Sequence, residues 1–123
     1  MARHNEIGRH GEILARTFLV QKGYRILAAN WRHGRAEVDL IARENDTLVF
    51  VEVKTRSTDA FGRPDEFVSI KKERLIAKVA CAYMELTHFQ GEIRFDIISI
   101  LLEEQGESSI EHIEDAFFPG IGR

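Results

Sequence analysis

The stretch from Ala36 to Lys54 constrains the fold of this chain most strongly, because polarity alternates with a period of two in both of its halves. Such alternation is typical of β-strands that have one buried face. Polar, turn-forming residues around Asn45 and Asp46 separate the two halves, so the stretch predicts a β-hairpin. One face of the hairpin is expected to carry the apolar side chains of Val38, Leu40 and Ala42 in the first strand and Val49, Val51 and Val53 in the second.

The register of this hairpin would bring two carboxylates together. Symmetric closure over the turn places Asp39 opposite Glu52 and Glu37 opposite Lys54. A shift of one residue would put valines among the carboxylates, so the apolar pattern favours this register. Opposed Cβ atoms lie about 4.5–5.5 Å apart, and two carboxylates that close repel unless a proton or a cation lies between them. The register therefore predicts a cation site, for which a divalent metal is the obvious occupant.

The composition is ordinary for one globular domain of 123 residues, with 44% hydrophobic and 30% charged residues. We expect a single domain over residues 1–123, with residues 118–123 as a tail. No apolar run approaches the roughly 18 residues of a membrane span, and the first residues lack the apolar segment of a signal peptide. A cytoplasmic protein without a membrane partner is therefore expected. The lone Cys81 excludes an internal disulfide and is expected to be a buried structural thiol, since it falls in an apolar helical pattern.

Basic segments flank the acidic hairpin. Residues 1–35 carry seven Lys and Arg against two Asp and Glu, and residues 54–78 carry seven against four, whereas residues 36–53 carry one against five. Within the second basic segment Lys71, Arg74 and Lys78 share one helix face, with Lys72 adjacent to it. Aligned cations beside an acidic spot suit an enzyme that acts on a polyanion. A solvated surface of mixed charge explains the same pattern.

The rest of the chain predicts helices and further strands around the hairpin. We expect a first helix from an N-cap at Asn5 to about Lys22 and a second whose buried stripe is Leu75, Ile76, Val79, Tyr83 and Leu86. The expected ranges are strand 24–32, the hairpin, loop 55–65, helix 69–86, strand 91–102 and an acidic edge strand over 109–117. This order of a helix, three strands, a helix and one or two strands predicts an α/β (α+β) domain, with helices packed on a sheet.

The first helix contains a stripe of small residues, Gly8, Gly11 and Ala15, at helical spacing. Because each glycine inside a helix costs about 1 kcal/mol relative to alanine, the stripe predicts that the sheet or another group approaches this face closely. Glu12 lies beside the stripe. Its carboxylate either is solvated or points at the hairpin.

The motifs of the chain resemble those of a known family. Asp39, followed after twelve residues by Glu52-Val53-Lys54, is similar to the Asp…(Asp/Glu)-x-Lys pattern of the PD-(D/E)XK nucleases. Over roughly residues 4–100 the chain closely resembles the YraN-like bacterial family, and more distantly the archaeal Holliday-junction resolvases. The words that carry this resemblance are Gly8-x-x-Gly11-Glu12-x-x-Ala15, Gly23-Tyr24-x-Ile26-Leu27-x-x-Asn30-Trp31-Arg32, Glu37-Val38-Asp39-Leu40-Ile41-Ala42, Leu48-Val49-Phe50-Val51-Glu52-Val53-Lys54-x-Arg56 and Arg94-Phe95-Asp96.

The resemblance implies a restriction-endonuclease-like fold, a mixed sheet flanked by helices. It implies that Asp39, Glu52 and the carbonyl of Val53 bind Mg²⁺ or Mn²⁺. Lys54 would orient the attacking water or stabilise the transition state, and Glu12 would bind the metal through water or complete a second site. In the predicted register Glu37 faces Lys54, and an ion pair between them would restrain the charge of that lysine.

The implied partner is nucleic acid, with DNA foremost, and junction-cleaving relatives act as two-fold homodimers. The candidates for phosphate contact are Arg35, Arg56, Lys71, Lys72, Arg74 and Lys78. Two positions depart from the pattern: Val38 stands in place of the proline of the motif, and Ala36 in place of the usual glycine of the family.

Two functions from different classes fit these residues. The first is a metal-dependent endonuclease acting in DNA repair or recombination, which requires the opposed carboxylates and Lys54. The alternative is a non-catalytic module that retains the fold and binds nucleic acid or a protein partner, in which case salt-sensitive DNA binding would survive loss of both carboxylates. A third interpretation treats the carboxylates and lysine as an ion-pair patch on a scaffold.

Overall fold

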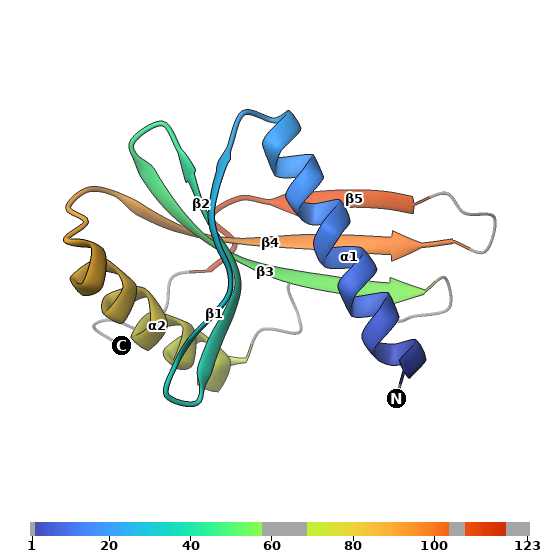
Figure 1. The fold of residues 1–123 in the computed structure, drawn as a ribbon, viewed down its shortest axis with the longest axis horizontal. Helices are drawn as coiled ribbons and strands as arrows, with labels where there is room; N and C mark the ends of the chain where they lie inside the picture. Colours follow the sequence, from blue (N-terminus) through green and yellow to red (C-terminus); the bar gives the residue numbers. More distant parts are fainter. Residues whose placement is uncertain (1, 58–68, 104–107, 118–123) are drawn as a thin grey trace.

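The computed structural model describes residues 2–57, 69–103 and 108–117 of the chain. Its elements follow the order α1 (Ala2–Gln21), β1 (Arg25–His33), β2 (Ala36–Glu44), β3 (Thr47–Ser57), α2 (Ile70–Thr87), β4 (Ile93–Leu102) and β5 (Ser108–Ile113) (Figure 1). This is the predicted order and the predicted α+β class. In the described residues, neither helix is both long and apolar enough to cross a membrane.

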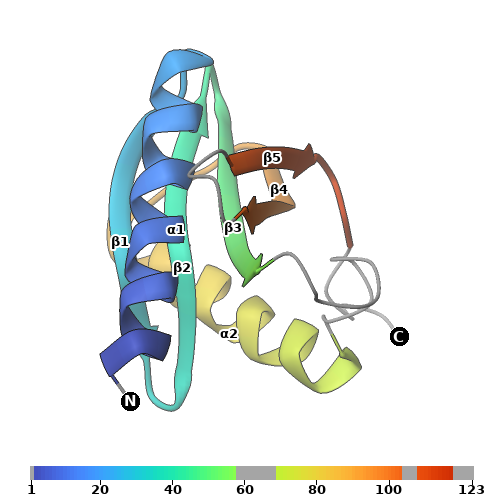
Figure 2. The same ribbon diagram turned by 90° about the vertical axis from the view of Figure 1, so that its right-hand side faces the viewer.

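The five strands form one mixed sheet in the order β1-β2-β3-β4-β5. β3 and β4 pair in parallel, and the other neighbours pair antiparallel. α1 packs against one face of the sheet and α2 against the other (Figures 1 and 2). β5 is an edge strand, as predicted from the last third of the chain.

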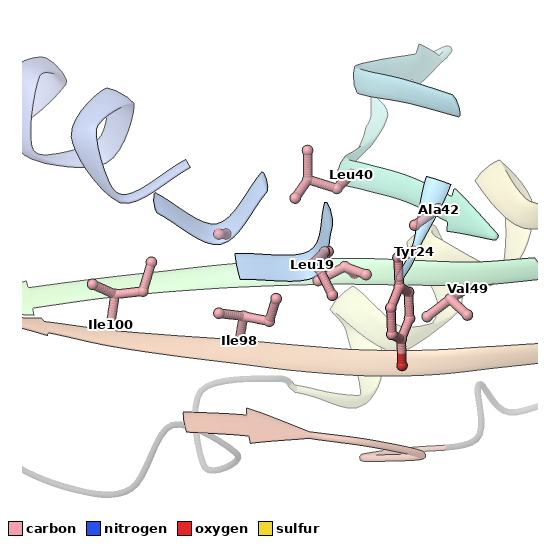
Figure 3. Close-up of a cluster of buried hydrophobic side chains, with 9 residues drawn as sticks. Leu19, Tyr24, Leu40, Ala42, Val49, Ile98 and Ile100 are labelled. Atoms are coloured by element: carbon pink, nitrogen blue, oxygen red, sulfur yellow. The ribbon is translucent and has the colours of Figure 1, made fainter. Parts of the chain in front are cut away.

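Each helix closes its own hydrophobic core. On the α1 side, Ala15 and Leu19 are fully buried against side chains of β2, β3 and β4. In Figure 3, Leu19 is drawn between Ile98 on one side and Tyr24 and Val49 on the other, all in the same cluster. On the α2 side, the buried cluster comprises Ala36, Val38, Ile41, Leu48, Phe50, Ile76, Val79, Ala80 and Phe95.

α1 approaches the sheet closely at Gly11, as the small-residue stripe predicts. A Cβ added there would overlap the hydroxyl of Thr55 in β3 and lie 2.8 Å from the Cβ of that threonine. Gly8, by contrast, has open space around it. The predicted N-cap at Asn5 is wrong, because the helix already begins at Ala2 and no glycine or proline precedes Asn5 to stop it.

The prediction that Val38 lies on the same face of the sheet as Leu40 is wrong. Val38 packs among the side chains that face α2, whereas Leu40, two residues later, faces α1. The change coincides with Asn30 of β1, which has a left-handed backbone (φ 53°) between the ladder pairs that flank it. Side chains alternate strictly between the two faces of a sheet only where the backbone is extended. The alternation in β2 is therefore interrupted opposite Asn30, between Val38 and Leu40.

Three further expectations fail for geometric reasons. The predicted loop over residues 55–65 begins too early, because residues 55–57 continue β3 and pair with β4; residues 58–65 lie outside the described residues, as does the predicted tail. Ser69 does cap α2, but Leu86 is 67% exposed and Cys81 is also exposed. At 3.6 residues per turn, Cys81 lies about 140° around the helix from Ile76, far from the buried face.

A buried ionic network ties the α1 side of the sheet together. Asp96 is fully buried and accepts two hydrogen bonds from the Arg94 guanidinium at 2.9 Å, while its Oδ2 lies 2.7 Å from Nε2 of His112 in β5. Arg94 also donates to Glu44 at 3.0 Å and to the hydroxyl of Tyr24 at 2.6 Å. Burial alone would raise the pKa of Asp96, but the bonds from His112 and Arg94 hold it below its usual value. The sequence shows Arg94 and Asp96 only as a motif, without indicating these partners.

Candidate metal site

The site forms where β2 separates from β3. The ladder between these strands runs from Glu44–Thr47 to Leu40–Val51, which confirms the predicted register of the hairpin. Both strands continue beyond the last pair, but from there β2 pairs only with β1 and β3 only with β4. The first side chain past the separation is Asp39, and its Oδ2 accepts a hydrogen bond from the backbone N–H of Val53 at 2.7 Å. The carboxylate thus takes the place that a carbonyl would occupy in a continued ladder.

Glu52 projects from β3 into the same region and is almost completely buried, with 2% exposure. Its Oε1 lies 2.9 Å from Nζ of Lys72, which reaches it from α2. Its Oε2 is buried and has no hydrogen-bond partner in the part of the chain that the structure describes. A buried carboxylate oxygen without a partner is costly, so this atom marks a place that suits a cation.

Burial and neighbouring charges shift the pKa values of Asp39, Lys54 and Lys72. Burial raises the pKa of Asp39 to about 7, and the neighbouring Glu52 carboxylate adds to the rise. Burial lowers the pKa of Lys54, and the Lys72 ammonium lowers it further. Burial would also lower the pKa of Lys72, but the hydrogen bond to Glu52 raises it above its usual value. Two acids and two amines therefore share one partly desolvated space.

The predicted pairing of Glu37 with Lys54 is wrong. Glu37 lies on the part of β2 that pairs with β1, and its Oε2 accepts a hydrogen bond from Nε of Arg32 at 2.8 Å. The pairing would require the β2–β3 ladder to continue past Leu40, whereas the ladder ends there. The lysine instead lies close enough to Glu52 and Asp39 for both carboxylates to influence its pKa.

Glu12 is held next to the site by β1. Its Oε1 accepts a hydrogen bond from Nδ2 of Asn30 at 3.0 Å. Asn30 lies opposite Asp39, since the residues on either side of it in β1 pair with the residues on either side of Asp39 in β2. Among residues 2–57, 69–103 and 108–117, no three His, Cys, Asp or Glu side chains gather as a metal cluster. The structure thus brings Asp39 and Glu52 together, without Glu12 as a third direct member.

The cations predicted to meet phosphate fall into two groups. Lys71, Arg74 and Lys78 are exposed along α2, and Arg35 is exposed in the turn between β1 and β2. Lys72 instead enters the site, and Arg56 is partly buried in β3. Lys78 also borders a groove of about 950 Å³ between the outer side of α2 and the end of β1, where Trp31, Arg32 and His33 lie.

Sequence reasoning missed the role of Lys72 as the partner of Glu52. The two residues are twenty positions apart, and only the packing of α2 against the sheet joins them. The sole local signal is that Lys72 follows the Ser69 cap by three residues, which fixes its place in the first turn of α2.

Comparison with known proteins gives one family. A family model described as "Uncharacterised protein family UPF0102" matches residues 11–100. A relative named "UPF0102 protein" from Christiangramia forsetii is 48% identical over 118 residues, covering 96% of this chain and 98% of its own length. Another of that name, from Bacteroides thetaiotaomicron, is 44% identical over 121 residues, covering 98% and 99%.

Among solved structures, that of Pyrococcus furiosus SfsA in complex with Ca²⁺ is similar. The match has 18% sequence identity and a TM-score of 0.36, and it covers 90% of this chain and 63% of that chain. At this TM-score the likeness supports no inference about function.

Proposed function

Since this chain belongs to the uncharacterised protein family UPF0102, we propose a function from its own residues: a divalent-metal-dependent endonuclease that hydrolyses phosphodiester bonds of nucleic acid. DNA is the proposed substrate, in repair or recombination. The proposal rests on one observation, the convergence of Asp39 and the buried Glu52 at the point where β2 leaves β3.

The residues of the site fit Mg²⁺ or Mn²⁺. These hard cations prefer oxygen ligands, and Asp39, Glu52 and the Val53 carbonyl are the proposed donors. The buried Oε2 of Glu52, which has no hydrogen-bond partner among the described residues, supports this fit. When bound, the ion would activate the attacking water and neutralise charge on the scissile phosphate.

Lys54 is the proposed catalytic residue beside the metal ligands. Burial lowers the pKa of its amine, so the amine can exchange a proton more readily than a solvated lysine. Its ammonium form would stabilise the negative charge that develops on the phosphoryl oxygens. Glu12, held by Asn30, is proposed to orient water at the edge of the site.

Exposed cations are proposed to hold the phosphate backbone. Lys71, Arg74 and Lys78 on α2 and Arg35 at the hairpin turn are accessible to a polyanion. Partly buried Arg56 is included as a further contact at the end of β3. Contacts of this kind position nucleic acid without reading its sequence, so binding should weaken steeply as salt rises.

The test is a cleavage assay with several nucleic acids. The purified protein is incubated with supercoiled plasmid, single strands, duplex, a four-way DNA junction and an RNA hairpin, in Mg²⁺, Mn²⁺ or EDTA. We expect cleavage of at least one substrate with metal, and its loss in a double variant with Asp39→Asn and Glu52→Gln. The proposal is refuted if no substrate is cut, or if the double variant cuts as well as the wild type.

A second candidate function is a non-catalytic nucleic-acid-binding module. The observation that favours it is the ion pair between Lys72 and Glu52, because an internal ammonium can replace a metal as the counter-charge of the carboxylate. This alternative predicts that the double variant binds DNA with unchanged affinity and salt dependence, while neither protein cleaves.

The proposal extends to a homodimer. Ile13 and Val20 of α1 are 55% and 56% exposed, and Leu27 of the edge strand β1 is 38% exposed. Light scattering coupled to size exclusion tests this point: the dimer mass supports it, and the monomer mass at micromolar concentration contradicts it.

A further inference from the structure

Lys72 reaches the candidate metal site from the first turn of α2. The hydroxyl of Ser69 caps this helix and accepts a hydrogen bond from the Lys72 backbone N–H at 3.1 Å. The side chain ends 2.9 Å from Oε1 of Glu52. The Lys72 side chain is 39% exposed, whereas that of Glu52 is 3% exposed. The lysine therefore has room to move toward solvent, and the glutamate does not.

The surroundings of Lys72 indicate that attraction to Glu52 holds it in place. The N-terminus of a helix is the positive end of its dipole and disfavours cations in the first turn. The Lys54 amine lies beside it, and a hydrogen bond between the two amines raises the pKa of Lys72 and lowers that of Lys54, so Lys72 is the amine that keeps its proton. The neighbouring Lys71 lies in the same turn and is exposed, so this turn does not itself require a buried amine.

The ion pair satisfies one oxygen of Glu52, while Oε2 has no hydrogen-bond partner in the described part of the chain. A divalent cation held by Asp39 and Glu52 would satisfy Oε2 and would place its charge next to the Lys72 ammonium. Like charges this close repel strongly in a desolvated site. The lysine and a metal ion therefore compete for the same carboxylate.

We propose that Lys72 is a positioning residue with two alternating partners: Glu52 in the metal-free site, and a substrate phosphate once a divalent cation has displaced it. The inference rests on the proposed function, because it requires metal at Asp39 and Glu52. The exchange needs only rotation of a long, partly exposed side chain. It is also reciprocal: the factor by which Lys72 weakens metal binding equals the factor by which metal weakens the ion pair.

Calorimetric titration of Mn²⁺ into the full-length protein at pH 8 tests the competition. Lys72→Met keeps the length of the side chain and removes its charge, and Lys71→Met is the matched control from the same turn. We expect the Lys72 variant to bind Mn²⁺ at least about fivefold more tightly than wild type, as is typical of a coupled pair of sites. The control should remain within twofold of wild type. Equal or weaker binding by the Lys72 variant than by the control overturns the inference.

Binding of a cleavage-resistant phosphorothioate oligonucleotide, followed by fluorescence anisotropy, tests the exchange. In EDTA the Lys72 variant should bind like wild type, because the wild-type lysine is occupied by Glu52. In Mn²⁺ the variant should bind more weakly, and the slope of its affinity against salt should fall by about one. Equal weakening in both conditions would mean that Lys72 contacts phosphate without any exchange, which contradicts the inference.

Asp39→Asn separates failure of this inference from failure of the proposed function. If this variant binds Mn²⁺ as tightly as wild type, or if wild type and the Lys72 variant both bind none, the proposed metal site is wrong and the inference falls with it. If Asp39→Asn loses Mn²⁺ binding while the two lysine variants have equal affinity, only the exchange is refuted. Should Lys72→Met fail to fold, NMR of the Lys72 side chain in the wild type during a Mg²⁺ titration decides: its signal should move on binding, and an unchanged signal refutes the exchange.

Discussion

Replacing Asp39 by asparagine should stabilise the metal-free protein at alkaline pH. Burial and the Glu52 carboxylate raise the pKa of Asp39 from 3.8 to about 7, so the folded state resists ionisation of this group. The unfolded chain ionises it at the ordinary pKa, and stability is therefore lost as pH rises from about 4 through 7. Asparagine does not titrate and can still accept the hydrogen bond from the Val53 N–H.

The size of the effect follows from the two pKa values. Each pKa unit corresponds to about 1.4 kcal/mol, so the full penalty above pH 7 is about 4 kcal/mol. At pH 5 part of the penalty, about 1.7 kcal/mol, is already present, because the unfolded state is ionised there. The advantage of Asp39→Asn should thus grow by about 2–3 kcal/mol between pH 5 and pH 8. Any change in strength of the Val53 hydrogen bond cancels in this difference.

Urea unfolding in EDTA, followed by far-ultraviolet circular dichroism at both pH values, measures the effect. Asp46→Asn is the control, because Asp46 is fully exposed in the turn between β2 and β3. Its stability relative to wild type should change little with pH. If Asp39→Asn has the same stability as wild type at pH 8, or an advantage that does not depend on pH, the reasoning about a desolvated carboxylate pair is refuted.

Three other perturbations address the packing, the ionic network and the metal site. Gly11→Ala should lower stability by about 1–3 kcal/mol in urea unfolding, because its methyl group overpacks against β3; Gly8→Ala, with open space around it, should be neutral or gain up to about 1 kcal/mol, and equal effects would contradict the packing account. Arg94→Met should cost on the order of 3–5 kcal/mol in the same assay, because it leaves the fully buried Asp96 without its main counter-charge; a loss below 1 kcal/mol would show that the network is not a structural anchor. Mn²⁺ affinity, measured by calorimetry, should rise about tenfold per pH unit below pH 7 and then level off, because metal must displace the proton of Asp39; an affinity independent of pH would contradict the raised pKa.

The hairpin was predictable because its apolar alternation allows only one register. A slip by one residue would bury carboxylates in the α1 core, so the sequence already implies the approach of Asp39 and Glu52. The prediction fails where that logic stops applying. Past Leu40 the β2–β3 ladder ends, and the partners of Val38 and Glu37 follow from pairing with β1 instead.

Contacts between distant elements were not predictable from local patterns. The ion pair between Lys72 and Glu52 depends on how α2 packs against the sheet. The helical periodicity of the sequence places Lys72 on a basic helix but does not indicate its partner. The network of Arg94, Asp96 and His112 joins β4 to β5. The one signal that could have indicated it is the alternation of Arg94 and Asp96 with apolar residues in this strand, because buried charges require partners.

Crystals of the protein soaked in Mn²⁺ and measured at the manganese absorption edge test the central claim most directly. The account predicts one anomalous peak bound by Asp39, Glu52 and the Val53 carbonyl, and no peak there in the double variant with Asp39→Asn and Glu52→Gln. A wild-type crystal without this peak, in which Lys72 still contacts Glu52 at saturating Mn²⁺, would contradict it.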